Sequence, residues 1–314
     1  MVIPLTLLAF AALVAAVAPR LLTRAAWADR EPVLALWVWQ CVVAAVLLCC
    51  GLAMSLSAAV AWAQVHSGVF APAPAAVRDA YGDTTGAPWA AALALALAAG
   101  GLWTAVMFVR EVRTARVQRR RRREELRRRA PLLPGEESGA ERLVVLEGER
   151  PDAWWLPGGQ AAQLIITTAA LRRLKKRQLD AVLAHEMGHS RARHHWLQHC
   201  AGALAGVPRM PVFRAFRDEV HRLCELAADD VASRRFGRMT FATALVELNE
   251  DRGVFGPGPG HHGHHAHLPQ RVDRLLAAAP RFTPARRLRL TVAALLAPAV
   301  PLLVAFGPGL SALA

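Results

Sequence analysis

The feature that most constrains this chain is a set of four long apolar stretches. A helix needs about 20 apolar residues to cross the hydrocarbon core of a bilayer. Stretches of about that length or more cover residues 1–18, 33–63, 88–109 and 289–306 of a 314-residue chain in which 54% of the side chains are hydrophobic. The first stretch has an alternative interpretation as a cleaved signal peptide, but it lacks the basic start of such peptides. We therefore expect a mostly α-helical membrane protein with about four transmembrane helices.

The arginines between these stretches predict how the chain is oriented in the membrane. Basic residues gather in the segments 20–30, 110–129 and 281–289, whereas the 64–87 connection carries one arginine and two aspartates. Connections rich in Lys and Arg stay in the cytoplasm. We therefore expect a multi-pass protein of the cell membrane with residues 110–288 in the cytoplasm and both termini outside.

An arginine run follows the third apolar stretch, in a chain whose net charge is +14. Such a run can bind nucleic acid, but directly after a membrane span it is more typical of a helix that lies on anionic lipid headgroups. We expect a basic juxtamembrane helix over 110–130, the lipid bilayer as a partner, and no nucleic acid. The domains expected are then three transmembrane helices within 1–109, a folded domain over 131–288, and a last transmembrane helix within 289–314.

The pattern of the middle segment favours an α+β fold. Apolar runs separated by Pro and Gly predict short strands around 143–147, 153–156 and 163–167. A short helix is expected after Thr167 or Thr168, followed by one helix from Gln178 to beyond His195 and another over roughly 212–236. In the helix that starts at Gln178, helical spacing predicts a buried stripe made of Leu179, Val182, Leu183 and Met187.

The stretch AVLAHEMGHSRARHH places a glutamate between two histidines that lie four positions apart. Side chains four apart on a helix lie nearly one above the other, so His185 and His189 can reach a single ion. Neutral imidazole is a preferred zinc ligand, and Glu186 is placed to take a proton from a metal-activated water. The pattern predicts a zinc site with His185 and His189 as ligands and Glu186 as the general base.

A catalytic zinc needs a third protein ligand. Our candidate is Glu225, because Asp229 follows one turn later on the same helical face and can orient a ligand imidazole. The alternative is a solvated acidic face, which Asp218, His221 and Arg222 would share. His221 is the next candidate ligand.

The segments AVLAHEMGHSRARHH and ELAADD resemble the membrane-bound zinc peptidases of the HtpX and CAAX prenyl protease group, and still more the BlaR/MecR-type antirepressor peptidases. The resemblance implies a gluzincin-like peptidase domain with one zinc ion per chain. It implies that His185, His189 and Glu225 bind the zinc, that Glu186 is catalytic, and that Asp229 supports the ligands. The segment HLPQRVDRL resembles a histidine segment ahead of an arginine pair in the HtpX group, which implies that His267 or His265 stabilises the transition state.

These observations predict a membrane-embedded zinc endopeptidase whose protein or peptide substrate is a cytoplasmic repressor-type regulator or a damaged membrane protein. One alternative is a proteolytically inactive signalling or scaffold protein with a structural metal site, although such a site does not require Glu186. The other is a metal-handling protein that uses the histidine-rich loop 261–267. No run of charged or metal-binding residues lies within the apolar stretches, which disfavours metal transport, because transport needs an intramembrane path.

Overall fold

The fold is described from a computed structural model. It covers residues 2–65, 88–129, 142–156, 163–207, 210–250, 268–277 and 280–313. Four of the described helices are long and apolar enough to cross a membrane, by length and composition. They are α1 (Val2–Leu22), α3 (Pro32–Val65), α5 (Pro88–Arg129) and α12 (Pro284–Leu313), and they contain the four apolar stretches.

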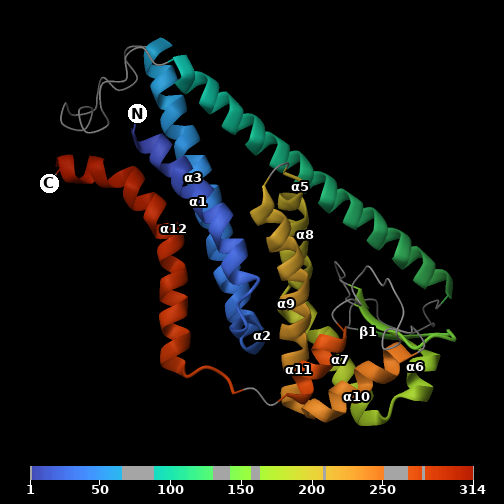
Figure 1. Cartoon of the computed structure of the whole chain (residues 1–314). Helices are drawn as coiled ribbons and strands as arrows, with labels where there is room; N and C mark the ends of the chain where they lie inside the picture. The colour runs from blue at the N-terminus through green and yellow to red at the C-terminus, as the bar shows by residue number, and fades with distance from the viewer. Residues whose placement is uncertain are drawn as a thin grey trace.

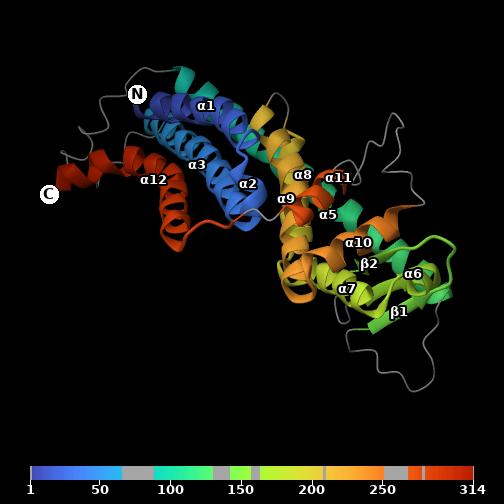
Figure 2. The same ribbon diagram turned by 60° about the horizontal axis from the view of Figure 1, so that its bottom comes forward.

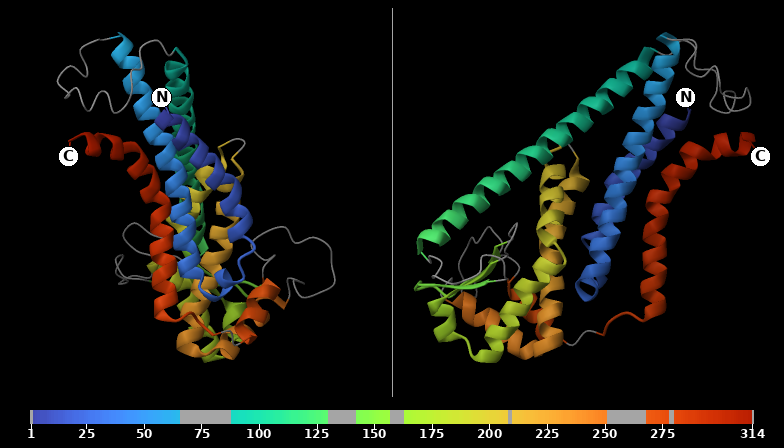
Figure 3. Two further views of the ribbon diagram at one scale, coloured as in Figure 1. Left: turned by 60° about the vertical axis from the view of Figure 1, so that its left-hand side comes forward. Right: turned by 180° about the vertical axis from the view of Figure 1, so that it is seen from behind.

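The long helices diverge from one end of the molecule. Helices α1 and α3 lie side by side, and both termini lie at the end of these helices that is remote from the strands (Figure 1). Helix α5 starts beside α3 and runs past α8 toward the sheet (Figure 3). The third apolar stretch and the arginine run are thus parts of one continuous 42-residue helix.

The small sheet has three strands, β1 (Arg142–Leu146), β2 (Ala153–Leu156) and β3 (Gln163–Thr167). Their order is β1-β3-β2, with β1 parallel and β2 antiparallel to β3. The predicted strands are shifted by no more than one residue from these. Thr167 ends β3 and caps α6 (Thr168–Arg173), because its hydroxyl accepts a hydrogen bond from the Ala170 amide at 3.3 Å. These three short strands are the sheet of the described residues, and most of the other described residues are helical.

The helix predicted from Gln178 to beyond His195 is in fact two helices. Helix α7 (Lys176–Arg191) stops, and α8 (His194–Ala205) starts after a turn in which Arg193 has φ 52° and ψ 36°. That left-handed conformation is costly for a residue with a Cβ atom and ends the helical hydrogen-bond ladder. The sequence prediction is wrong here because neither glycine nor proline marks the turn.

Helices α7 and α9 (Pro211–Phe236) pack closely, and small residues make this possible. The buried stripe predicted for α7 is only partly right: Val182 is buried, whereas Leu179, Leu183 and Met187 are partly buried. The fully buried face instead carries the residues Gln178, Ala181, Val182, Ala184, His185 and Gly188. The sheet lies against this helix through β2 (Figure 2). Helix α10 (Arg238–Asn249) packs against both α7 and α9, and helix α11 (Leu268–Leu276) packs against α9 and α10.

Helices α8 and α9 share a hydrophobic core with the apolar helices α1 and α3. Trp39 of α3 is 1% exposed, and its ring lies 6.2 Å from that of Phe216 in α9. Val220 of α9 and Leu204 of α8 belong to the same buried cluster. The helix that carries the predicted acidic ligand is therefore packed directly on the helices of membrane length.

The close approach of α7 and α9 at Gly188 gives a first prediction. A Cβ atom at Gly188 would lie 3.4 Å from Ala228 Cα and 3.5 Å from Val231 Cβ, which is ordinary contact. Gly188→Ala should therefore be tolerated, whereas Gly188→Leu should destabilise the protein by about 1–3 kcal/mol through overpacking. Thermal unfolding of the full chain in detergent measures both. Equal stability of the two variants would contradict this packing.

Candidate metal centre

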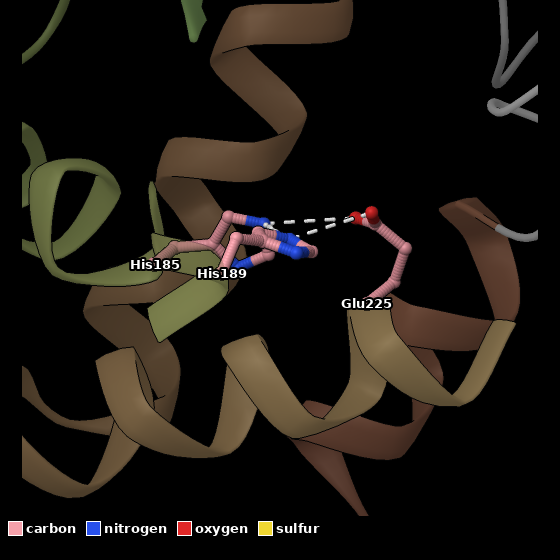
Figure 4. Close-up of side chains that lie close together, drawn as sticks. All are labelled: His185, His189 and Glu225. Carbon is pink, nitrogen blue, oxygen red and sulfur yellow. Dashed lines mark hydrogen bonds and ion pairs between the residues drawn. The ribbon is translucent and has the colours of Figure 1, made fainter. Parts of the chain in front are cut away.

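Three side chains from two helices converge on one point. His185 and His189 project from α7 toward Glu225 of α9 (Figure 4). The two Nε2 atoms lie 3.2 Å apart, Nε2 of His185 lies 3.6 Å from Oε2 of Glu225, and Nε2 of His189 lies 3.4 Å from Oε1 of Glu225. One ligand atom from each residue can be chosen so that all three are within 4.8 Å of one another.

These distances fit a zinc ion. Two ligand atoms of a tetrahedral zinc, each about 2.1 Å from the ion, lie about 3.4 Å apart. The separation of the two imidazole nitrogens, and the distance of each from one of the two Glu225 oxygens, are close to that value. Two imidazoles and one carboxylate leave a fourth position open. The residues present therefore fit a bound zinc of the catalytic kind.

The His185 ring is fixed from two sides. Its Nδ1 atom lies 3.1 Å from Oδ1 of Asp229, a side chain with 0% exposure, and Phe241 of α10 stacks on the ring at 5.4 Å. With Nδ1 directed at Asp229, the Nε2 atom of His185 faces the point of convergence. The place predicted for Asp229, behind a histidine, agrees with this geometry.

Arg271 of α11 joins the two acidic side chains. Its Nε and Nη2 atoms donate to Asp229 at 2.8 and 2.5 Å, and Nη1 lies 2.8 Å from Oε2 of Glu225. The sequence analysis gave Arg271 no role. A usable pattern was present, because Leu268, Arg271 and Leu275 share the buried face of α11, where an arginine needs an acidic partner.

His194 holds the second histidine and was also missed. Its Nδ1 atom lies 3.0 Å from Nδ1 of His189, and its side chain is buried. The left-handed turn at Arg193 reverses the chain so that the first residue of α8 faces back toward α7. No sequence pattern indicated the turn, so nothing placed His194 beside His189.

Burial and neighbouring charges set the pKa values of the four groups around the point of convergence. Burial lowers the pKa of His189 to about 3, aided by His185, which keeps its imidazole neutral. Burial also disfavours charge on His185, but the nearby carboxylates of Asp229 and Glu225 outweigh this and raise its pKa to about 9. For Glu225 and Asp229, Arg271 overcomes the effect of burial and lowers both pKa values. Both carboxylates are therefore charged at neutral pH.

Glu186 lies on α7 between the two histidines and is partly buried. Burial lowers the pKa of Arg271, but the carboxylates of Asp229, Glu225 and Glu186 together raise it. The negative charge of Glu186 thus acts on Arg271, the cation that also interacts with Glu225 and Asp229. His265 and His267, proposed above as stabilisers of the transition state, lie outside the described residues, as does the rest of the histidine-rich loop.

The comparison with family models concerns this part of the chain. Residues 117–217 match the model of Peptidase family M48. The matched segment is similar to M48 peptidases. The M48 match supports a membrane-type zinc metallopeptidase of the HtpX and CAAX protease kind, as the motifs indicate. The matched segment contains His185, Glu186 and His189 and ends before Glu225. The likeness to antirepressor peptidases stays a prediction. Searches of curated proteins and of solved structures gave no match.

The next prediction tests Glu225 as the third ligand of the candidate zinc site. Glu225→Ala removes one of three donor atoms and should cost most of the bound zinc. Asp229→Ala removes only the group behind His185 and should weaken zinc binding by about 10- to 100-fold. Glu219→Ala, on the same helix but paired with Arg222, is the matched control and should keep its zinc. Zinc content of the purified chains decides; stoichiometric zinc in Glu225→Ala would point to His221 instead.

A further prediction concerns His194 and acid. Burial, with some help from His185, lowers the pKa of His194 to about 4, and that of His189 is about 3. Near pH 5 the unfolded chain binds a proton at each of these histidines that the folded chain does not, so stability falls as the pH falls from 6.5. His194→Gln removes one such proton and should reduce the slope by about 1.4 kcal/mol per pH unit.

The measurement for His194 is the free energy of unfolding of the zinc-free chain in detergent between pH 5 and 6. His195→Gln is the comparison, because burial also lowers the pKa of this partly buried histidine, but by less than that of His194, so the slope should fall less. Identical slopes for His194→Gln and the unmodified chain would show that His194 titrates normally when folded.

Proposed function

We propose that this protein is a membrane-anchored zinc endopeptidase that hydrolyses peptide bonds of protein substrates. The observation that carries the proposal is the convergence of His185, His189 and Glu225 at separations that fit one tetrahedral zinc. The M48 match over the segment that contains both histidines supports the same chemistry.

In this proposal Nε2 of His185, Nε2 of His189 and the Glu225 carboxylate hold the ion. When bound, zinc supplies Lewis acidity, which activates a water and polarises the substrate carbonyl. Asp229 keeps the proton of His185 on Nδ1, and His194 accepts the Nδ1 proton of His189. Both contacts orient the Nε2 atoms toward the position of the ion.

Glu186 carries the proton transfers. The water oxygen attacks the peptide carbonyl carbon while a carboxylate oxygen of Glu186 takes the proton of the water. The carbon–nitrogen bond then breaks, and Glu186 delivers that proton to the departing amine. The guanidinium group of Arg271 is paired with Asp229 and Glu225. It therefore keeps the Glu225 carboxylate ionised throughout the reaction.

The substrate class follows from where the helices place the centre. Helix α9 is packed on α1 and α3, so the centre is held beside the helices of membrane length. We infer that the M48 segment faces the cytoplasm, since the arginine clusters lie at that end of the spans. Substrates are then cytoplasmic regulators of the repressor type or damaged membrane proteins that present an unfolded segment near the bilayer.

The test of this function separates catalysis from metal binding. Glu186→Gln keeps both histidines and Glu225, so zinc should remain stoichiometric while hydrolysis of an unfolded protein falls by at least about 100-fold. Glu219→Gln, a change of the same kind outside the centre, should retain activity.

Two outcomes would overturn the proposal. Equal cleavage by zinc-loaded Glu186→Gln would remove the proposed general base. Zinc binding by the unmodified chain without any cleavage would favour an inactive signalling or scaffold protein with a structural metal site.

A further inference from the structure

A large basic cavity lies away from the metal centre. It has a volume of about 1170 Å³. Its lining comes from residues 23–30, from α9 and the start of α10, and from residues 270–277 and 280–281. Helix α2 (Trp27–Arg30), which forms one wall, lies beside α9 (Figure 2). None of the three zinc donors lines this cavity. It is therefore a separate feature of the same helices.

The cavity carries excess positive charge. Its described lining includes seven arginines and three aspartates, which leaves four positive charges in excess. Asp230, 7% exposed, accepts bonds from Arg274 at 2.7 Å and Arg281 at 3.1 Å, and lies 3.3 Å from Arg234. Three guanidinium groups thus share one carboxylate, so they are held in place without being neutralised.

Three further arginines of the lining have no acidic partner among the described residues. Arg24 and Arg30 are exposed and make no ion pair within the described part of the chain, where Arg238 donates only to the Ala277 carbonyl. Guanidinium groups bind phosphate through two parallel hydrogen bonds, more strongly than they bind neutral acceptors. The chemistry of this cavity therefore suits a phosphate-bearing anion.

The position of the cavity indicates which anion. Helix α1 ends at Leu22 and α3 begins at Pro32, so the wall at residues 23–30 is the connection between two membrane-length helices. Glu31 accepts hydrogen bonds from the Phe282 amide at 2.9 Å and from Arg287 at 2.6 Å, which fixes the start of α12 at the same level. Three apolar helices thus end or begin at the edge of the cavity, which is the level expected for the headgroups of a bilayer that these helices cross.

We propose that this cavity binds the phosphate headgroup of an anionic phospholipid. Basic pockets between transmembrane helices on the cytoplasmic side suit such headgroups. The lipid phosphate sits among Arg24, Arg30 and Arg238, while the arginines bound to Asp230 form the floor. The acyl chains extend along α1 and α12, whose apolar side chains are exposed beside the cavity.

The experiment measures lipid binding to the purified full chain by native mass spectrometry. The probes are dioleoylphosphatidylglycerol, dioleoylphosphatidylcholine and inorganic phosphate. The chain should prefer the glycerol lipid over the choline lipid by at least about 10-fold, because each arginine near a headgroup contributes roughly a fivefold gain. Replacing Arg24, Arg30 and Arg238 together by Gln should lower binding of the glycerol lipid by about 10- to 100-fold.

The matched control is the triple change of Arg120, Arg121 and Arg122 to Gln. These arginines are exposed on α5 and remove the same charge from another basic surface. Binding in the control should fall by less than about threefold, because diffuse attraction spreads over many charges. Equal losses in both triple variants, or no preference between the two lipids, would overturn the proposal. Equal competition by inorganic phosphate would assign the cavity to a free anion instead.

Retained zinc content and an unchanged unfolding transition show that the cavity variant is folded. If the triple variant does not fold, Arg238→Gln alone serves, since this exposed side chain donates only to the Ala277 carbonyl. Its binding of dioleoylphosphatidylglycerol should fall by roughly fivefold. Unchanged binding in a folded Arg238→Gln chain would also overturn the proposal.

Discussion

The candidate centre depends on one buried cation, the guanidinium group of Arg271. Asp229 and Glu225 lie one turn apart on α9, and Asp229 is completely buried. Two such carboxylates repel each other in a low-dielectric interior, and removing one partner of a buried ion pair costs about 3–5 kcal/mol. Arg271 makes hydrogen bonds or ion pairs with both, so it fixes α11 to α9 and keeps the acidic side chains ionised. Asp229, held by Arg271, in turn orients the ring of His185. Glu225, held by the same guanidinium group, is the third candidate donor.

The sequence predicts the parts of this protein that depend on local patterns. Runs of apolar residues predict the four long helices. The spacing of His185 and His189, with the choice of Glu225 because Asp229 follows one turn later, predicts three side chains that the structure brings together. Turn residues next to apolar runs predict the three strands within one residue.

The remaining features depend on tertiary contacts that no local pattern encodes. The end of α7 depends on the left-handed conformation of Arg193, and no glycine or proline in the turn indicates this conformation in the sequence. The contact between His194 and His189 follows from that turn. The role of Arg271 depends on a helix distant in sequence. Likewise, apolar side chains of α8 and α9 suggest an ordinary domain core, yet they pack on α1 and α3.

Helices α9 and α11 are joined by two ion pairs in succession, and the second has a thermodynamic consequence. Arg271 pairs with Asp229 at the candidate metal centre. One helical turn later, Arg274 pairs with the adjacent Asp230 at the floor of the basic cavity. A headgroup that favours this arrangement of the two helices would also favour the arrangement that holds the zinc donors. Linkage is reciprocal, so zinc would then strengthen lipid binding by the same factor by which lipid strengthens zinc binding. The bilayer would act on such an enzyme as an effector as well as a solvent.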